Sequence, residues 1–197
     1  MTRLAAVLML AASILGSGCA PLIIGGAAAG GAVLAVDRRH ADVQLADQRI
    51  EWQASGRIDA KLKGQGHVNV TSYNRHVLLT GEATTEAFKL DAESIAAAVT
   101  DAKSVVNDIQ ISAPTSLGAR SNDTYLTGLV KGRFVNDQKF NPLHVKVVTE
   151  SGIVYLLGLV TQKEADDAAN IARHVSGVRK VVRVLEYIPE PPPPRVK

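Results

Sequence analysis

VNVTSYNRHVLLTG, residues 68–81, and VKVVTESGIVYLLG, residues 145–158, share the pattern V-x-V-x(6)-V-x-L-x-G. Every matched position in these two stretches lies 77 residues apart. The match continues at an offset of 76, where Ile95 and Val99 correspond to Ile171 and Val175. Farther on, Val105, Val106 and Ile109 correspond to Val181, Val182 and Leu185. A repeat of this length indicates two copies of one folding unit.

The first copy predicts the order helix, strand, strand, helix, strand. Its first helix is predicted from apolar residues at roughly helical spacing, with Trp52 and Ala54 among them: Val43, Ile50, Ile58 and Leu62. Strands at 68–73 and 77–80 flank a turn-prone Tyr73-Asn74-Arg75. A second helix is predicted from about Thr84, with Glu86 placed for a capping interaction, to about Val99. The last strand is predicted at 104–111.

The second copy repeats this plan. Ser121-Asn122-Asp123 predicts a helix start, and Leu126, Val130 and Phe134 then share one face. Strands follow at 143–149 and 153–157. Thr161 and Glu164 fit a capping box for a helix that runs to about Val175, and residues 178–188 form the final strand.

The predicted fold class is therefore α+β, with two tandem αββαβ domains. A helix between the second and third strands requires a parallel crossover, so each three-stranded sheet should be mixed and should pack against two helices. The predicted domains are residues 43–113 and 122–188, joined by a linker at 114–121. Because this linker is short and contains Pro114 and Gly118, the two domains are expected to touch.

The first 18 residues have the features of an export signal. Arg3 is the only charged residue before Asp37, and an apolar stretch runs from Leu4 to Leu15. The sequence Leu15-Gly16-Ser17-Gly18-Cys19 resembles the lipobox of bacterial lipoproteins, although Gly16 stands where that family usually has a branched aliphatic residue. The resemblance implies that Cys19 is lipidated and becomes the first mature residue. The alternative is an ordinary secretory signal that is cleaved elsewhere.

The segments outside the two domains are predicted to be a tether and a tail. Residues 19–42 are predicted to be a lipidated tether, because the uncharged Gly- and Ala-rich part from Ala20 to Val36 has 17 residues and a bilayer span needs about 20. The alternative is that its small-x-x-x-small spacing packs helices in a membrane. Residues 189–197 form a Pro-rich tail, expected to be exposed. By resemblance to enterobacterial lipoproteins, Ala20 after the cysteine implies transfer to the outer membrane.

The sequence offers no equipment for catalysis. None of the five histidines lies in an H-x-x-x-H or C-x-x-C context, so a zinc site has no support. No P-loop or G-x-G-x-x-G motif follows a strand and opens a helix. We therefore expect no enzyme activity and no cofactor, and nothing indicates a nucleic-acid partner.

Charge and side-chain type point to the second domain as a binding module. Residues 44–112 hold seven Lys and Arg against nine Asp and Glu, whereas residues 122–188 hold nine against seven, so the domains carry net charges of −2 and +2. The first helix of the second domain adds an aromatic, an aliphatic, two cations and two glycines, which suit a membrane interface. The predicted phospholipid-binding residues are Tyr125, Gly128, Leu129, Lys131, Gly132 and Arg133. The alternative is that Tyr125 and Leu129 pack against the first domain.

Two copies of helix, V-x-V hairpin with Gly, helix and strand behind a lipobox resemble the tandem BON-domain lipoproteins of Gram-negative bacteria. The resemblance is strongest in Ser121-Asn122-Asp123-Thr124, Val145-Lys146-Val147, Gly158-Leu159-Val160-Thr161 and Val175-Ser176-Gly177-Val178. It implies binding of anionic phospholipid, such as phosphatidylglycerol, through the helix that carries Tyr125. It also implies anchoring at the periplasmic face of the outer membrane, a role in membrane integrity and a place near division sites or the outer-membrane assembly machinery.

A second class of function competes with lipid binding. In this alternative the chain is a scaffold in the cell envelope that binds a protein partner through a helix surface or the Pro-rich tail. Membrane attachment would then come from the lipidated Cys19 alone.

Overall fold

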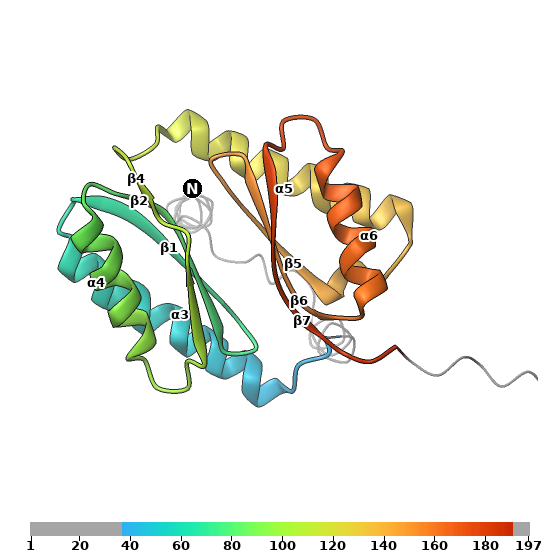
Figure 1. Ribbon diagram of the computed structural model, residues 1–197, viewed down its shortest axis with the longest axis horizontal. Helices are drawn as coiled ribbons and strands as arrows, with labels where there is room; N and C mark the ends of the chain where they lie inside the picture. The colour runs from blue at the N-terminus through green and yellow to red at the C-terminus, as the bar shows by residue number, and fades with distance from the viewer. Residues whose placement is uncertain (1–36, 191–197) are drawn as a thin grey trace, which may run out of the picture. The chain divides into compact units, whose positions relative to one another are not determined.

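The computed structural model describes residues 37–190, which fold as helix, strand, strand, helix, strand in two successive copies (Figure 1). The first copy comprises α3 (Ala41–Leu62), β1 (Gly66–Tyr73), β2 (His76–Ala83), α4 (Glu86–Ala97), β3 (Ser104–Asn107) and β4 (Gln110–Ile111). The second comprises α5 (Leu117–Asp137), the short 3₁₀ helix η2 (Pro142–His144), β5 (Val145–Glu150), β6 (Ile153–Val160), α6 (Gln162–Arg173) and β7 (Lys180–Tyr187). The predicted α+β class is confirmed. The signal peptide, Cys19, most of the tether and most of the Pro-rich tail lie outside the described residues.

Both sheets are mixed, as the crossover argument predicts. β1 pairs antiparallel with β2, and β2 pairs parallel with β3. In the second copy β5 pairs antiparallel with β6, and β6 pairs parallel with β7. The one irregularity among these described strands is that the predicted strand 104–111 is divided into β3 and β4, which both pair with β2. Asp108 and Ile109 lie between them, and the Ile109 side chain is fully buried in the core.

Alternate residues of each central strand point to opposite sides, and this divides the interior into three clusters. Val77 and Leu79 of β2 pack against α3 and α4, and Val154 and Leu156 of β6 belong to the corresponding cluster with α5 and α6. The glycine of the repeat lies where strands approach closely. A Cβ added to Gly81 would lie 2.1 Å from the carbonyl oxygen of residue 67, and one added to Gly158 would lie 2.4 Å from that of residue 144.

A third apolar cluster joins the other sides of the two sheets, and it contains Tyr73 and Leu78 of the first domain with Tyr155 and Leu157 of the second. The domains therefore touch, as the short linker predicts. Polar groups add to this contact: the Tyr155 hydroxyl donates to Asp108 Oδ2 over 2.8 Å. Burial is the first cause that raises the pKa of Tyr155, and the acceptor Asp108 adds to it.

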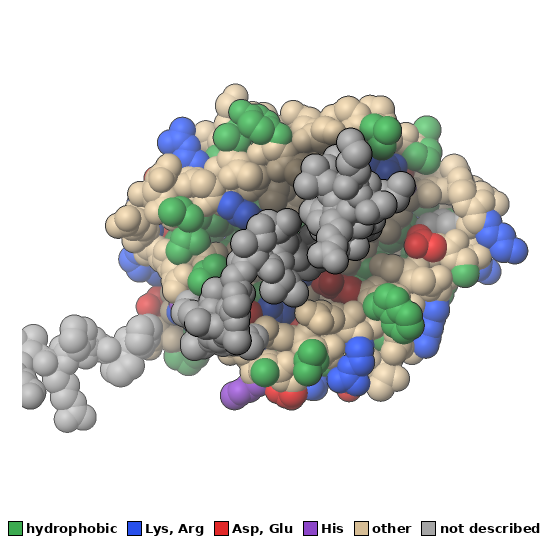
Figure 2. Space-filling model, turned by 180° about the vertical axis from the view of Figure 1, so that it is seen from behind, with side chains coloured by type: hydrophobic (Ala, Val, Ile, Leu, Met, Phe, Trp, Pro, Cys, Tyr) green, Lys and Arg blue, Asp and Glu red, His purple; other side chains and the backbone are tan. Residues whose placement is uncertain are grey.

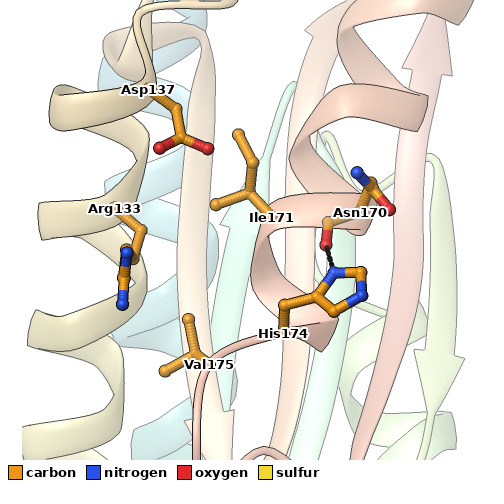
Figure 3. Close-up of a pocket in the computed structure, with 6 residues that line it drawn as sticks. All are labelled: Arg133, Asp137, Asn170, Ile171, His174 and Val175. Atoms are coloured by element: carbon orange, nitrogen blue, oxygen red, sulfur yellow. Dashed lines mark hydrogen bonds between the residues drawn. The ribbon is translucent and has the colours of Figure 1, made fainter.

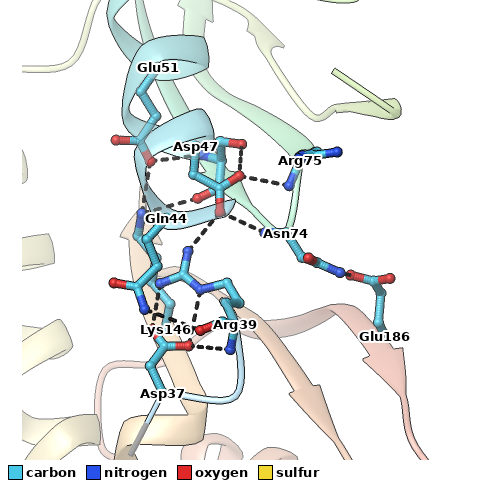
Figure 4. Close-up of polar contacts among 10 residues, drawn as sticks. Asp37, Arg39, Gln44, Asp47, Glu51, Asn74, Arg75, Lys146 and Glu186 are labelled. Carbon is cyan, nitrogen blue, oxygen red and sulfur yellow. Dashed lines mark hydrogen bonds and ion pairs between the residues drawn. The ribbon is translucent and has the colours of Figure 1, made fainter. Parts of the chain in front are cut away.

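A network of charged groups closes one edge of the domain contact (Figure 4). Lys146 of β5 donates to Glu51 of α3 over 2.8 Å, and Asn74 donates to Glu186 of β7 over 2.7 Å. Residues 37–40, which precede α3, also contact this network. Arg39 pairs with Asp47 at 2.8 Å and lies 3.9 Å from the centre of the Tyr73 ring.

Arg38 contacts the second domain instead. Its guanidinium donates to both carboxylate oxygens of Glu164, at 2.6 and 3.0 Å, and to the carbonyl oxygen of Leu159 at 2.8 Å. The adjacent residues Arg38 and Arg39 therefore contact different domains, Arg38 the second and Arg39 the first.

The prediction that Ser121-Asn122-Asp123 opens a helix is wrong. Helix α5 begins at Leu117, and Ser116 is its N-cap, accepting a hydrogen bond from the Ala119 amide at 3.3 Å. Asp123 lies inside the helix, where its buried carboxylate accepts bonds from the amides of Ser151 and Gly152, both at 2.8 Å.

Asp47 of α3 does the same in the first domain. It accepts bonds from the amides of Asn74 and Arg75, at 2.9 and 2.7 Å, so each copy fixes its hairpin turn with a buried aspartate.

The other helix starts are close to prediction. Thr161 and Glu164 form the predicted capping box at the start of α6. The predicted start of α4 is one residue early, since Thr85 rather than Thr84 is the N-cap and accepts from the Phe88 amide.

Candidate functional site

Helix α5 is held rigidly by the side that faces its own sheet. Leu126, Val130 and Phe134 are buried, as their spacing predicts. Asp123 holds the helix to the β5–β6 turn, and the Thr127 hydroxyl donates to the Thr149 hydroxyl of β5 at 2.8 Å. These contacts fix the rotation of the helix about its axis and therefore decide which side chains it presents outward.

The outward side of α5 carries a row of apolar and small residues. The Tyr125 side chain is 63% exposed, and both Gly128 and Gly132 are exposed. A Cβ added at either glycine would meet no atom within 4 Å outside its own helix, so neither glycine serves packing within the protein. The backbone of α5 is therefore open to a flat surface between Tyr125 and Gly132.

Two cations flank this row. Lys131 and Arg133 are both exposed. Arg133 also lines a hollow of about 280 Å³ between α5 and α6, with Asp137, Asn170, Ile171, His174 and Val175 (Figure 3). The His174 ring is oriented in this hollow by a 2.7 Å contact of its Nδ1 with the carbonyl oxygen of Asn170. The hollow thus combines a cation, a carboxylate and hydrogen-bonding groups with two apolar side chains.

One predicted site residue on α5 is less exposed than the others. Leu129 is only partly exposed and packs against the core of the second domain, so it supports the helix more than it presents a surface. It does not pack against the first domain as the alternative supposes, and Tyr125 projects outward.

Sequence reasoning missed two exposed apolar residues on α5. Leu117 is 79% exposed and Val135 is 58% exposed. Together with Tyr125, Gly128 and Gly132 they recur at intervals of three, four or eight residues, which is a helical spacing. This spacing predicts a shared outward side only if the helix begins at Leu117.

Comparison with known proteins identifies the family to which this architecture belongs. The family model described as BON domain matches twice, at residues 46–113 and 122–189. The chain belongs to the BON-domain family. Each BON match covers one sheet and the helix between its second and third strands, and begins inside the first helix of its copy, at residue 46 of α3 and residue 122 of α5.

Three relatives are similar over much of the chain. The Outer membrane lipoprotein DolP of Haemophilus influenzae is 37% identical over 183 residues, covering 92% of this chain and 94% of that protein. The 21 kDa hemolysin of Actinobacillus pleuropneumoniae is 34% identical over 155 residues, covering 78% and 80%. The Osmotically-inducible protein Y of Escherichia coli is 30% identical over 122 residues, covering 60% and 61%.

The chain thus fits a tandem BON outer-membrane lipoprotein, and these relatives indicate no catalytic function. Among the described helices, none is both long and apolar enough to cross a bilayer.

Proposed function

We propose that the second BON domain binds anionic phospholipid through the outward side of α5, and that a lipid on Cys19 anchors the protein at the periplasmic face of the outer membrane. The observation that carries this proposal is an exposed tyrosine beside two exposed glycines, with cations on both sides, on a helix fixed from behind. The similarity to an outer membrane lipoprotein over 92% of the chain supports the location.

The apolar and small residues suit the headgroup layer of a bilayer. A tyrosine ring buries its apolar body while its hydroxyl stays hydrated, so Tyr125 fits the depth where lipid headgroups meet acyl chains. Because Gly128 and Gly132 lack side chains, the backbone of α5 approaches the lipids closely around this ring. Leu117 and Val135 extend the apolar contact toward the two ends of the helix.

The cations supply selectivity for anionic lipid. Each Lys or Arg near an anionic leaflet contributes about 1 kcal/mol. Arg133 is placed best, since it lies at a hollow where Asn170 and His174 offer hydrogen bonds to a phosphate or a headgroup hydroxyl. Two such cations contribute about 2 kcal/mol, and their replacement by glutamate adds repulsion, so the expected loss of affinity exceeds tenfold.

Liposome co-sedimentation tests the proposal. The chain from Ala20 to Lys197, without the lipid anchor, is mixed with phosphatidylglycerol or phosphatidylcholine vesicles at low salt. Wild type should bind the anionic vesicles selectively, and Tyr125→Ala/Lys131→Glu/Arg133→Glu should lose that binding. The matched control is Lys103→Glu/Lys180→Glu, which reverses two exposed cations that lie on neither α3 nor α5. The proposal fails if wild type ignores the anionic vesicles.

Salt separates lipid binding from the scaffold alternative. Attraction to headgroups weakens as the Debye length falls from about 10 Å at 0.1 M salt to about 3 Å at 1 M. An apolar interface with a protein partner should not weaken in this way. Binding that survives 1 M salt, or that requires another protein, would favour the scaffold.

A further inference from the structure

A tryptophan on the surface of the first domain has no role in the fold. Trp52 lies on α3, and its side chain is 79% exposed, although its place among apolar residues at roughly helical spacing suggests a core position. The residues that do face the core are Ile50, Ala54 and Ile58, and Trp52 projects to the other side of the helix. Leu45, two turns earlier, is 59% exposed. Large apolar side chains exposed in this way point to contact with something outside the described fold.

The repeat relates this surface to the outward side of α5. The buried residues Ile50, Ala54 and Ile58 correspond to Leu126, Val130 and Phe134 at an offset of 76. At the same offset Trp52 stands where α5 has Gly128, Gly56 where it has Gly132, and Arg57 where it has Arg133.

Both helices thus present one exposed aromatic ring, an open glycine and an arginine, with the ring moved by about one turn. Gly56, like its counterpart, has no atom within 4 Å of an added Cβ outside its own helix.

The exposed charges around Trp52 are mainly positive, although the first domain as a whole has a net charge of −2. The exposed cations of α3 and its C-cap are Arg49, Arg57, Lys61 and Lys63, and its exposed acids are Asp42 and Asp59. Lys61 pairs with Asp91 of α4 at 3.3 Å and Asp42 pairs with Arg75 at 3.9 Å, so the remaining cations Arg49, Arg57 and Lys63 face the single acid Asp59. The other two acids of the helix point inward, where Asp47 pairs with Arg39 and Glu51 pairs with Lys146. The outward surface of α3 therefore carries a local charge of about +2 and complements an anionic partner.

We infer that α3 is a second membrane-contact helix, which places Trp52 in the headgroup layer of an anionic bilayer while Arg49 and Arg57 meet lipid phosphates. This inference rests on the proposal that the protein engages phospholipid, but it concerns a different helix on a different sheet. Tryptophan is enriched at membrane interfaces because its large ring is apolar and its indole N–H stays hydrated.

The shape of the surface favours a bilayer over a protein partner. Trp52, Gln53, Gly56 and Arg57 line a wide, shallow hollow of about 450 Å³ rather than a deep groove. On the part of the molecular face that Figure 2 leaves uncovered, hydrophobic side chains lie in separate groups among charged ones. A stable protein interface needs about 800 Å² on each partner with an apolar centre, whereas a fluid bilayer accepts separate insertions.

Tryptophan fluorescence tests the inference, because Trp52 is the only tryptophan in the chain. The described residues, 37–190, lie within one compact unit, so the chain from Ala20 to Lys197 retains the folded part. This chain is titrated with vesicles of phosphatidylglycerol, of brominated phosphatidylglycerol and of phosphatidylcholine. We expect a blue shift and quenching by the brominated lipid with the anionic vesicles. Arg49→Glu/Arg57→Glu should need at least tenfold more lipid for the same shift, and Lys103→Glu/Lys180→Glu less than threefold more.

Five outcomes would overturn the inference. If the chain co-sediments with anionic vesicles while the Trp52 emission stays unchanged, lipid binding through α5 stands and the contact through α3 is wrong. An equal shift with phosphatidylcholine, or an Arg49/Arg57 variant that binds as wild type does, excludes recognition of anionic lipid by α3. A shift that depends on protein concentration without lipid assigns the surface to a second copy of the chain. If nothing binds, both proposals fail.

Discussion

Replacing Asp123 with alanine should destabilise the second domain strongly, because one buried carboxylate holds the β5–β6 turn. Its two oxygens accept bonds from the amides of Ser151 and Gly152 at 2.8 Å each, and the Gly152 bond is fully buried. Both turn residues have positive φ, 49° at Ser151 and 72° at Gly152, so the turn depends on this support. A hydrogen bond to a charged group contributes about 1.5–3 kcal/mol, and a buried amide left without its acceptor costs more.

The expected loss in the free energy of unfolding is therefore about 3 kcal/mol or more. For a chain of this size the melting temperature should fall by about 6–12 °C. Urea denaturation at pH 7, followed by circular dichroism, measures the change. The matched control is Asp166→Ala, which removes an aspartate whose side chain is 56% exposed and pairs with Arg183 on the surface. Such a pair contributes at most about 1 kcal/mol. If Asp123→Ala were no less stable than Asp166→Ala, the account of the turn would be refuted.

Four further substitutions test other features of the structure. The pKa of Glu164 is lowered from 4.5 to about 2, since the bonds from Arg38, the Thr161 amide and His144 outweigh the opposing effect of burial. The stability that this ionised carboxylate contributes is present above pH 4.5 and is lost as pH falls toward 2. When the free energy of unfolding is measured with urea at several pH values, Glu164→Gln should therefore lose less stability than wild type between pH 4.5 and pH 2. An equal loss in both proteins would count against the ion pair. Arg39→Lys should lose about 1–2 kcal/mol, because lysine cannot stack on Tyr73 while it pairs with both Asp37 and Asp47, as the planar guanidinium does, and full stability would contradict this. Gly158→Ala should cost at least about 2 kcal/mol from the clash with residue 144, whereas Gly128→Ala should stabilise α5 by up to about 1 kcal/mol; equal effects in thermal melts would refute the packing argument.

The sequence predicts the parts of this structure that depend on local or repeated patterns. The V-x-V and V-x-L-x-G stretches predict both hairpins, and the intervening helix predicts the parallel third strand. The capping box of Thr161 and Glu164 is predicted as well, because all its atoms lie within four residues. These features need no knowledge of contacts distant in sequence.

Features that depend on distant contacts could not be predicted in the same way. Asp123 reads as a helix cap from its neighbours, yet its carboxylate meets amides that are 28 and 29 residues away. The predicted start of α5 is late because the residues directly after Leu117 show no apolar periodicity on the core side, and Ser116 caps the first turn of the helix. The exposure of Trp52 follows from the rotation of α3 about its axis. Ile50, Ala54 and Ile58, which recur every four residues, face the core, and Trp52 therefore lies on the opposite side of the helix. A spacing of four residues between core positions predicts that Trp52 lies on the surface.

The central claim is that the outward side of α5 contacts lipid, and nuclear magnetic resonance with a spin-labelled lipid tests it most directly. The amide signals of Gly128 and Gly132 are the best reporters, because both residues are exposed on α5 and glycine amides resonate in a distinctive region. With phosphatidylglycerol bicelles that contain a headgroup spin label, we predict strong broadening of these two signals and of Tyr125. The amides of Ala168 and Ala172, on the buried side of α6, should change little. Unchanged α5 signals in a sample where the protein binds the bicelles would contradict the account.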